Sequence, residues 1–488
     1  MIEKLIKKKE NFIPLLEFII AIFSISSYSL WTDEGIRLHA IVFGNLKEVV
    51  HYGLADKQLF FVLKQYIWTT IFGTSEIATR SLNLVFVLLI ITYLNRILRA
   101  RNINVCYGLI LFISPMFIYY MNDAGPYIMM LSYSFAFIYY IFFSREFNSK
   151  KNIFMINVVF LLGVGTHFIF GFVYLIYLVK ILESIYRKKI HIKTHFFIGL
   201  LFSPIYLTLL VIYLQAIESG ASRGWDPPTI LNVFFVLYSF IGSGGLSLSR
   251  NEIRAGNFET IQWHQLVAPS LLVIVMGLLL WISLKYRRVI IKPYSVLLAG
   301  TAVYGIVFFV FSYKWHFHFW ERHFITAYAV FILLLIEVAS RLSVKKMTAM
   351  CLSLLVALFL LSSFQLRFNP YYGKDNYKDT LFTVLHSKKA VILYQGDWKV
   401  SNYYGVDALD FNEYEKKTSK KDARGLTYVI DIRNKSKKEI EEISAHYPQE
   451  DVLIVLNEKY DSFNTLPEYK KNSNYTEKKY NTFSIFQK

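Results

Sequence analysis

Long apolar runs separated by short polar segments fill the chain as far as residue 364. A bilayer-spanning helix needs about 17–25 mostly apolar residues, and soluble chains rarely repeat runs of that length. The pattern therefore predicts a polytopic α-helical membrane protein with about eleven spans. The predicted spans are 13–30, 76–94, 104–120, 127–143, 153–166, 168–185, 196–215, 266–284, 295–313, 324–340 and 347–364.

Two of the apolar runs differ from a simple span. Residues 13–30 follow a basic start and are long for the apolar region of a secretory signal, so we interpret them as an uncleaved anchor. Residues 59–72 are short for a crossing and contain Lys64. That combination favours an interfacial or re-entrant helix within the first outer loop.

The composition changes at Gln365, where long apolar runs give way to short ones. Short apolar runs lie at 390–394, 427–431 and 452–456. They alternate with polar segments that have a helical pattern, such as Lys437–His446. This alternation predicts a small α/β domain. We therefore expect a transmembrane catalytic domain over 1–364 and an extracytoplasmic α/β domain over 365–488.

Basic residues set the predicted orientation. The 488-residue chain has a formal net charge of +18, yet 21 of its 53 Lys and Arg and only 3 of its 35 Asp and Glu lie in six short segments between spans. Clustering in alternate loops places those loops, and the N-terminus, in the cytoplasm of a multi-pass cell-membrane protein. A nucleic-acid partner is excluded, because its surface would gather charge on one soluble face. The segments are 1–12, 95–102, 144–152, 186–195, 285–292 and 341–346.

The two cysteines, Cys106 and Cys351, fall within apolar runs. This placement predicts neither a disulfide framework nor a cysteine metal site. The sequence also contains no Gly-rich phosphate-binding loop, so no nucleotide is expected.

Two adjacent carboxylates, Asp33 and Glu34, follow the first predicted span. Ionisable groups at the mouth of a span are costly to desolvate and point to function. A carboxylate there can take a proton from an incoming hydroxyl, and a second one can orient the acceptor or bind a cation. A solvated loop after a span is the simpler interpretation.

Other predicted outer loops also carry charged residues beside span ends. Asp123 lies in a six-residue turn, although Asn-Asp and Gly-Pro are common turn residues. Arg322 and His323 precede a late span, where Arg suits bidentate phosphate binding. An interfacial aromatic belt with a snorkelling Arg is the alternative. His167 has an apolar background, which is more typical of a hydrogen-bonded structural histidine.

Taken in order, these motifs resemble the GT-C superfamily of polyprenyl-phosphate-dependent glycosyltransferases, in its protein O-mannosyltransferase and aminoarabinose-transferase branch (glycosyltransferase family 39 type). The matching residues are Asp33-Glu34 for Asp-Glu, Leu59-Phe60-Phe61 for the Leu-Tyr segment, Phe72-Gly73-Thr74-Ser75-Glu76 with Arg80 for Phe-Gly-x-Ser-Glu-x-x-x-Arg, Asp123-Ala124-Gly125-Pro126-Tyr127 for Glu-Ala-Arg-Pro-Tyr, Thr166-His167 for Thr-His, Arg322-His323 for Arg-Tyr, and Tyr377-Lys378-Asp379 with Tyr403-Tyr404-Gly405 for the post-membrane segment. Lys57-Gln58 stands where the family has Pro-Pro, and Gly125 stands where it has Arg.

The resemblance implies an inverting transfer of a sugar from a polyprenyl-phosphate donor to an acceptor hydroxyl at the extracytoplasmic face. Asp33 would be the general base, with Glu34 and Asp123 positioning the acceptor. The implied donor-phosphate ligands are Arg80, Arg322, Lys57 and Lys314, and the implied substrate contacts are Tyr127, His167 and His323. The expected partners are this donor, a hydroxyl acceptor on a protein, lipid or glycan, and membrane lipid.

No metal site is predicted and no cofactor is certain, although Glu34 and Asp123 leave a divalent cation open. Two other classes of function also stay open: a transporter or flippase of lipid-linked glycans, and a non-enzymatic membrane scaffold. A transporter would place ionisable residues near mid-membrane and often show repeats. The notable acids and bases here lie at predicted outer ends, which favours an enzyme.

Overall fold

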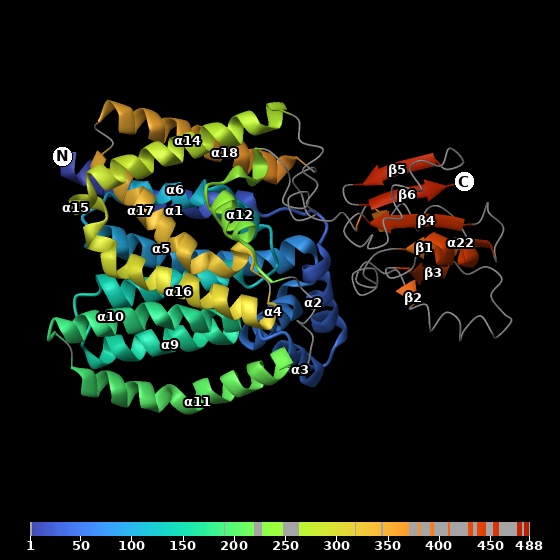
Figure 1. The fold of residues 1–488 in the computed structure, drawn as a ribbon, viewed down its shortest axis with the longest axis horizontal. Coiled ribbons are helices and arrows are strands. Elements are labelled where there is room, and N and C mark those ends of the chain that lie inside the picture. Colours follow the sequence, from blue (N-terminus) through green and yellow to red (C-terminus); the bar gives the residue numbers. More distant parts are fainter. Residues whose placement is uncertain are drawn as a thin grey trace. The chain divides into compact units, whose positions relative to one another are not determined.

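The structure is a computed structural model of the chain (Figure 1). It describes residues 2–189, 191–218, 227–246, 263–317, 319–342, 345–369, 378, 380–381, 391–394, 408–409, 428–432, 437–445, 452–457, 476–480 and 483–487. The chain forms two compact units. We call residues 1–26, 46–248 and 260–368 the helical unit, and residues 27–45, 249–259 and 369–488 the mixed unit.

The helical unit consists largely of long helices that run along a common direction in Figure 1. Its first half contains α1 (Ile2–Ser24), α3 (Leu46–Ala55), α4 (Leu59–Phe72), α5 (Glu76–Ala100), η1 (Val105–Gly108), α6 (Leu109–Phe112), α7 (Pro115–Met121), α8 (Tyr127–Ile138), η2 (Tyr139–Phe143) and α9 (Lys150–Thr166). Its second half contains η3 (Phe168–Val173), α10 (Tyr174–Tyr186), α11 (Ile192–Glu218), α12 (Ile230–Phe240), η4 (Ser243–Gly245), α14 (Trp263–Lys285), α15 (Arg287–Ile290), η6 (Lys292–Tyr294), α16 (Ser295–Trp315), η7 (Glu321–Phe324), α17 (Ile325–Leu342) and α18 (Lys346–Phe368).

Seven helices among the described residues are long and apolar enough to cross a membrane, which confirms a polytopic helical membrane protein. Shorter apolar helices cover 12–24, 59–72, 127–143 and 230–240. Helix α4 has the short length that the sequence predicts for an interfacial helix. The total of about eleven crossings and the orientation in the membrane stay predictions.

Helix α8 lies at the centre of the helical unit. All of its residues from Tyr127 to Ile138 are buried, as expected for a helix that is apolar on every face. It packs against α5, α9 and α17. Helix α11 is different, because side chains such as Leu201 and Leu207 remain largely exposed. The unit therefore has a tightly enclosed centre and a loosely covered edge.

The predicted span 104–120 is not one continuous helix. Helix α6 ends at Phe112, and α7 begins at Pro115, whose fixed φ and missing N–H suit a first helical position. The Ser114 hydroxyl donates to the Leu111 carbonyl at 2.5 Å and hydrogen-bonds the Tyr328 hydroxyl of α17. Tertiary contacts thus hold the break in place.

A buried ion pair joins the last turn of α17 to the end of α5. Glu337 is fully buried, and its carboxylate lies 2.7 Å from Arg101 and 3.2 Å from Arg341. The Tyr294 hydroxyl donates to the same carboxylate at 2.9 Å. A buried charge is tolerated only when it is paired and hydrogen-bonded. Arg101, Arg341 and Tyr294 together meet that condition for Glu337.

The mixed unit contains α2 (Thr32–Phe43) and a sheet with the order β2-β3-β1-β4-β6-β5. Its central strand β1 (Val391–Tyr394) pairs in parallel with β3 (Tyr428–Asp431) and β4 (Val452–Asn457). These strands and α22 (Lys437–Ala445) coincide with the predicted α/β elements, which are thereby confirmed. The remaining strands are β2 (Ala408–Leu409), β5 (Thr476–Tyr480) and β6 (Phe483–Gln487). The domain boundary at 364 and the extracytoplasmic location of 365–488 stay predictions.

Candidate active site

The two adjacent acids begin helix α2 of the mixed unit, and they have different environments. Glu34 is fully buried, and its carboxylate accepts a hydrogen bond from the Trp31 backbone N–H at 3.0 Å. The Glu34 carboxylate therefore satisfies a backbone N–H at the start of α2 for which the helix itself has no acceptor. Asp33 is only partly buried. Of the two carboxylates, Asp33 is the better placed for exchange with a substrate.

The α2 segment is tied to the chain that follows the last long helix. The Lys378 backbone N–H donates to the Ser29 hydroxyl at 3.1 Å. This contact brings together two segments that the family resemblance singled out separately. The neighbouring residues of that second segment, Tyr377 and Asp379, and the later Tyr403-Tyr404-Gly405 lie outside the described residues.

In the helical unit, the other candidates gather where α5, α8 and α17 begin; we call this the site end. Arg80 of α5 is 1% exposed, and its guanidinium donates to the Ser26 carbonyl at 3.1 Å. One turn later, the Asn83 side chain donates to the Asp123 carbonyl at 2.9 Å. Helix α5 thereby fixes both the end of the first helix and the Asp123 turn.

Asp123 is 1% exposed and shares a crowded turn with Gly125. A Cβ atom at Gly125 would lie 2.5 Å from Asp123 Oδ1 and 2.9 Å from the Tyr127 ring. Such a contact is shorter than real Cβ atoms show, so a larger residue would displace the carboxylate. The Asp123 turn of this chain therefore requires a residue without a side chain at position 125.

The η7 segment brings Glu321, Arg322 and His323 to the site end. The Tyr120 hydroxyl donates to Glu321 Oε1 at 3.0 Å. The Arg322 guanidinium carbon lies 6.0 Å from the centre of the Tyr127 ring, and this ring lies 4.9 Å from that of Tyr120. The Tyr127 ring also lies close to Gly125 of the Asp123 turn, so one aromatic side chain lies near both this turn and the guanidinium.

Both candidate histidines are buried and form local backbone hydrogen bonds. His167 Nδ1 accepts from the Ile169 N–H at 3.3 Å and begins η3, which supports the structural interpretation. His323 Nδ1 accepts from the Trp320 N–H at 3.4 Å, and its carbonyl accepts from the Tyr304 hydroxyl. Their ring centres are 6.1 Å apart. The two histidines thus position η3 against η7.

The two candidate lysines are separated. Lys57 is buried and has a left-handed backbone with φ 60°, and its carbonyl accepts from the Phe168 N–H at 3.1 Å. Burial lowers the pKa of the Lys57 ammonium, and the charge of Asp56 partly offsets this. Lys314 is exposed, with its ammonium 4.7 Å from the centre of the Trp315 ring. Lys57 therefore adjoins the His167 segment, whereas Lys314 lies at the surface.

Sequence reasoning overlooked two charged residues at this end. Glu321 directly precedes Arg322 in the sequence, and this adjacency is the signal that could have identified it. Lys64 of α4 donates to the Tyr133 hydroxyl at 2.8 Å and lies 5.5 Å from the centre of the Phe86 ring. Among the described residues it forms no ion pair, so its charge is stabilised by aromatic rings. Only the fold reveals those partners.

Among the described residues, no group of three or more His, Cys, Asp or Glu could hold a metal ion. Asp123 and Glu321 supply carboxylates at the site end.

No family model and no curated protein matches the chain. Among solved structures, the chain is similar to ArnT from Cupriavidus metallidurans in the apo state, with a TM-score of 0.49, 10% identity and 97% of each chain covered. ArnT bound to undecaprenyl phosphate gives a TM-score of 0.46 and 11% identity, again over 97% of each chain. A likeness at this level carries no functional assignment.

Proposed function

We propose that this chain is an inverting glycosyltransferase that moves a sugar from a polyprenyl-phosphate donor to an acceptor hydroxyl at the extracytoplasmic membrane face. The observation that carries the proposal is the convergence at the site end of Asp123, Glu321 and Arg322 around Tyr120 and Tyr127. A polytopic protein has little structural reason to bury so many ionisable groups together at one end of its helices.

The proposed reaction forms one bond and breaks another at the anomeric carbon. Asp33 takes the proton of the acceptor hydroxyl as that oxygen attacks from the face opposite the phosphate. The bond between the anomeric carbon and the phosphate oxygen breaks, and its electron pair leaves on the polyprenyl phosphate. Configuration is inverted, and no nucleotide or redox partner takes part.

The departing phosphate needs positive charge more than it needs a proton. Arg322 is half-buried beside Tyr127, and Lys57 is buried beside the His167 segment. We assign these two cations to the donor phosphate, because a site shielded from water strengthens each charge-assisted bond. Arg80 and Lys314 are the remaining candidates, with Arg80 acting through the chain at Ser26.

We assign the other candidate residues to positioning. Glu34 fixes the first turn of α2, so that Asp33 next to it presents its carboxylate from a rigid element. Asp123 and Tyr127 orient the acceptor, and His167 and His323 hold the loops that carry the phosphate ligands. Preorganised elements of this kind supply most of the rate enhancement when a reaction requires little covalent chemistry from the protein.

The test is transfer by the purified full chain from undecaprenyl-phosphate-linked sugars, measured as release of undecaprenyl phosphate. Asp33→Asn should lower transfer about a hundredfold or more, because it removes the base and keeps the shape. Glu48→Gln, at an exposed position of α3, is the matched control and should keep full activity. Retention of more than about a tenth of the activity by Asp33→Asn would contradict the base role.

A transporter or a scaffold predicts a different result in the same assay. Either would leave the sugar attached to its lipid, so no free undecaprenyl phosphate would appear with any donor. Failure of every donor and acceptor offered would remove the transferase proposal.

A further inference from the structure

Two glutamates of the helical unit are fully buried, and their surroundings differ. Glu337 is paired with Arg101 and Arg341 and accepts from the Tyr294 hydroxyl. Glu17 of α1 is 0% exposed as well, but among the described residues neither of its carboxylate oxygens has a hydrogen-bond partner and it forms no ion pair. An isolated buried carboxylate is very costly, so the charge of Glu17 must be neutralised.

The Glu17 carboxylate is enclosed by α5 and η1. A Cβ atom at Gly108 of η1 would lie 2.5 Å from Glu17 Oε1, and 3.4 and 3.6 Å from the side chains of Leu94 and Leu98. Only glycine therefore allows η1 to approach the carboxylate this closely. The two leucines make the surroundings of the carboxylate apolar.

Asn95 of α5 is the polar side chain that lies against Glu17. It is 7% exposed, and among the described residues its Oδ1 also has no hydrogen-bond partner. An ionised carboxylate contains only acceptors, so it could satisfy Asn95 Nδ2 but never Asn95 Oδ1. A carboxylic acid satisfies both, because its O–H donates to Oδ1 while its other oxygen accepts from Nδ2. One proton thus completes the pair.

Cations are a poorer explanation of the neutral pair. Helix α1 packs against α5, η1, α6 and α7. Arg96 of α5 instead lies over the Tyr93 and Tyr139 rings, 5.4 and 5.7 Å from their centres. The three side-chain oxygens of Glu17 and Asn95 are also few for Ca²⁺ or Mg²⁺, which take about six ligands or more. The remaining titratable groups that these elements carry near Asn95 and Gly108 are Arg99, Cys106 and Tyr107.

Helix α5 holds the first helix at two places. Beyond the end of α1, the Arg80 guanidinium donates to the Ser26 carbonyl at 3.1 Å. Further along α5, Asn95 meets Glu17. The Arg80 contact requires no proton on its acceptor, whereas the Asn95 contact is complete only when Glu17 is protonated. Loss of that proton would release α1 at one place and leave it held at the other.

We propose that Glu17 is a proton-binding site, where the protonated acid exchanges two hydrogen bonds with Asn95 at neutral pH and so fastens α1 to α5. At alkaline pH the proton leaves, Asn95 Oδ1 loses its donor and the carboxylate becomes an unpaired buried charge. Helix α1 then separates from α5 and η1 at this place. The inference does not rest on the proposed function, and neither of its measurements requires sugar transfer.

Glu17→Gln is the decisive variant. Glutamine has the shape of the protonated acid, and its amide can donate to Asn95 Oδ1 and accept from Nδ2. The midpoint of thermal unfolding of the full chain in detergent at neutral pH should therefore stay within about 2 °C. Glu337→Gln is the matched control at the second buried glutamate, and it should lower the midpoint by about 4 °C or more because it leaves buried cations unpaired. An equal loss for both variants would show that Glu17 is ionised and would overturn the proposal.

The pH dependence of the same midpoint has a defined sign. The folded chain keeps a proton on Glu17 that the unfolded chain has already released, so this part of the stability is lost as the pH rises. Between about pH 7 and about pH 9 the midpoint should fall further for the unmodified protein than for Glu17→Gln. Parallel curves for the two proteins would mean that Glu17 does not titrate, which contradicts the proposal.

Dicyclohexylcarbodiimide, an apolar reagent, detects the proton directly. The acid gives its proton to one nitrogen of the reagent while the carboxylate oxygen bonds to the central carbon, and the adduct rearranges to an N-acylurea that retains every atom of both reactants. Mass spectrometry of peptides should show labelling of Glu17 at least about tenfold faster than labelling of the ionised Glu337. Faster labelling of Glu337, or protection of Glu17 by Na⁺ or Ca²⁺, would overturn the proposal, because protection would identify a metal ion as the neutralising partner.

Gly108→Ala tests the position of the carboxylate. The added methyl group would contact Glu17 Oε1 at 2.5 Å, so it should lower the unfolding midpoint of the unmodified protein. In a Glu17→Ala background the same substitution should cost much less, because the contacted atom is absent. An equal cost in the two backgrounds would show that η1 does not close on Glu17, and the enclosed proton site would then be wrong.

Discussion

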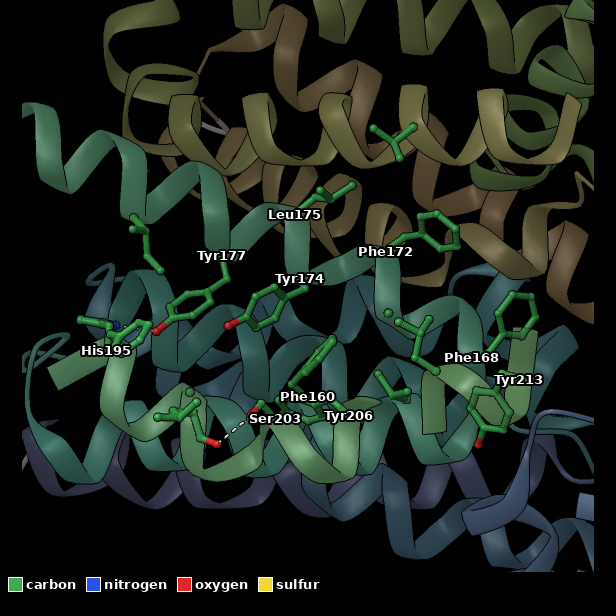
Figure 2. Close-up of a pocket in the computed structure, with 18 of the residues that line it drawn as sticks. Phe160, Phe168, Phe172, Tyr174, Leu175, Tyr177, His195, Ser203, Tyr206 and Tyr213 are labelled. Carbon is green, nitrogen blue, oxygen red and sulfur yellow. Dashed lines mark hydrogen bonds between the residues drawn. The ribbon is translucent and has the colours of Figure 1, made fainter. Parts of the chain in front are cut away.

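The site end can be compared with a cavity of about 840 Å³ lined by side chains of α9, η3, α10, α11 and α16, which we call the aromatic cavity (Figure 2). Both belong to the helical unit, but they are built in opposite ways. At the site end, polar side chains from α5, α7 and η7 hold one another, as in the hydrogen bond from Tyr120 to Glu321. In the aromatic cavity, polar side chains such as Tyr206 bond back to their own walls. The site end therefore presents charged groups to a substrate. The aromatic cavity presents an apolar surface, because its hydroxyl groups are already hydrogen-bonded to the protein.

This difference separates chemistry from binding. Substitutions at the site end should change the rate of the bound reaction, because charge there stabilises the transition state. Substitutions in the cavity, whose hydroxyl groups bond to the protein itself, should leave the rate at saturation intact. The following predictions, from the largest effect to the smallest, test that separation.

The largest effect is expected from Arg322→Ala. Loss of its guanidinium should lower kcat about 100- to 1,000-fold, since the departing phosphate loses a positioned donor. Steady-state kinetics with varied donor and varied acceptor measures this, and Arg322→Lys should recover part of the rate through its charge. Equal impairment of donor and acceptor use would remove Arg322 as the phosphate ligand.

Gly125→Ala should have the next largest effect. Its methyl group would contact Asp123 Oδ1 at 2.5 Å, so the carboxylate must move. A displacement of about 1 Å at a reacting centre costs about a hundredfold in rate. Undecaprenyl phosphate binding, measured in the same preparation, should be unaffected. Gly277→Ala, where a Cβ atom meets nothing within 4 Å, controls for the general effect of replacing a glycine. Full activity of Gly125→Ala would show that the Asp123 position is irrelevant to the reaction.

Tyr206→Phe should have the smallest effect. It removes the hydrogen bond to the Asn157 carbonyl and should lower stability by about 1 kcal/mol. Thermal unfolding in detergent measures this change. Lipid affinity and transfer should stay normal, because the hydroxyl serves the wall and not the ligand. Tyr174→Phe is the control within the same cavity. A large loss of lipid binding by Tyr206→Phe would mean that the hydroxyl contacts the lipid directly.

The sequence by itself determined the long helices and the α/β elements. Runs such as 168–185 and 347–364 are long and apolar enough to be membrane-spanning helices, so local composition is sufficient to place them. Short apolar runs at 390–394, 427–431 and 452–456 likewise predicted β1, β3 and β4. The break before Pro115 could not be located reliably in this way, because it depends on Ser114 meeting Tyr328 of a distant helix.

For the site, the sequence determined which residue types stand beside the ends of spans, and it singled out Asp123, Tyr127 and Arg322. Only the tertiary structure decided that Tyr127 lies between the other two, that Gly125 leaves room for the Asp123 carboxylate, and that Lys314 lies apart. It also decided that Lys64 is surrounded by aromatic rings and that α9, α10, α11 and α16 enclose a cavity. The physical reason is the range of the interactions: membrane insertion follows from the apolarity of each segment alone, whereas a site depends on contacts between side chains far apart in the chain.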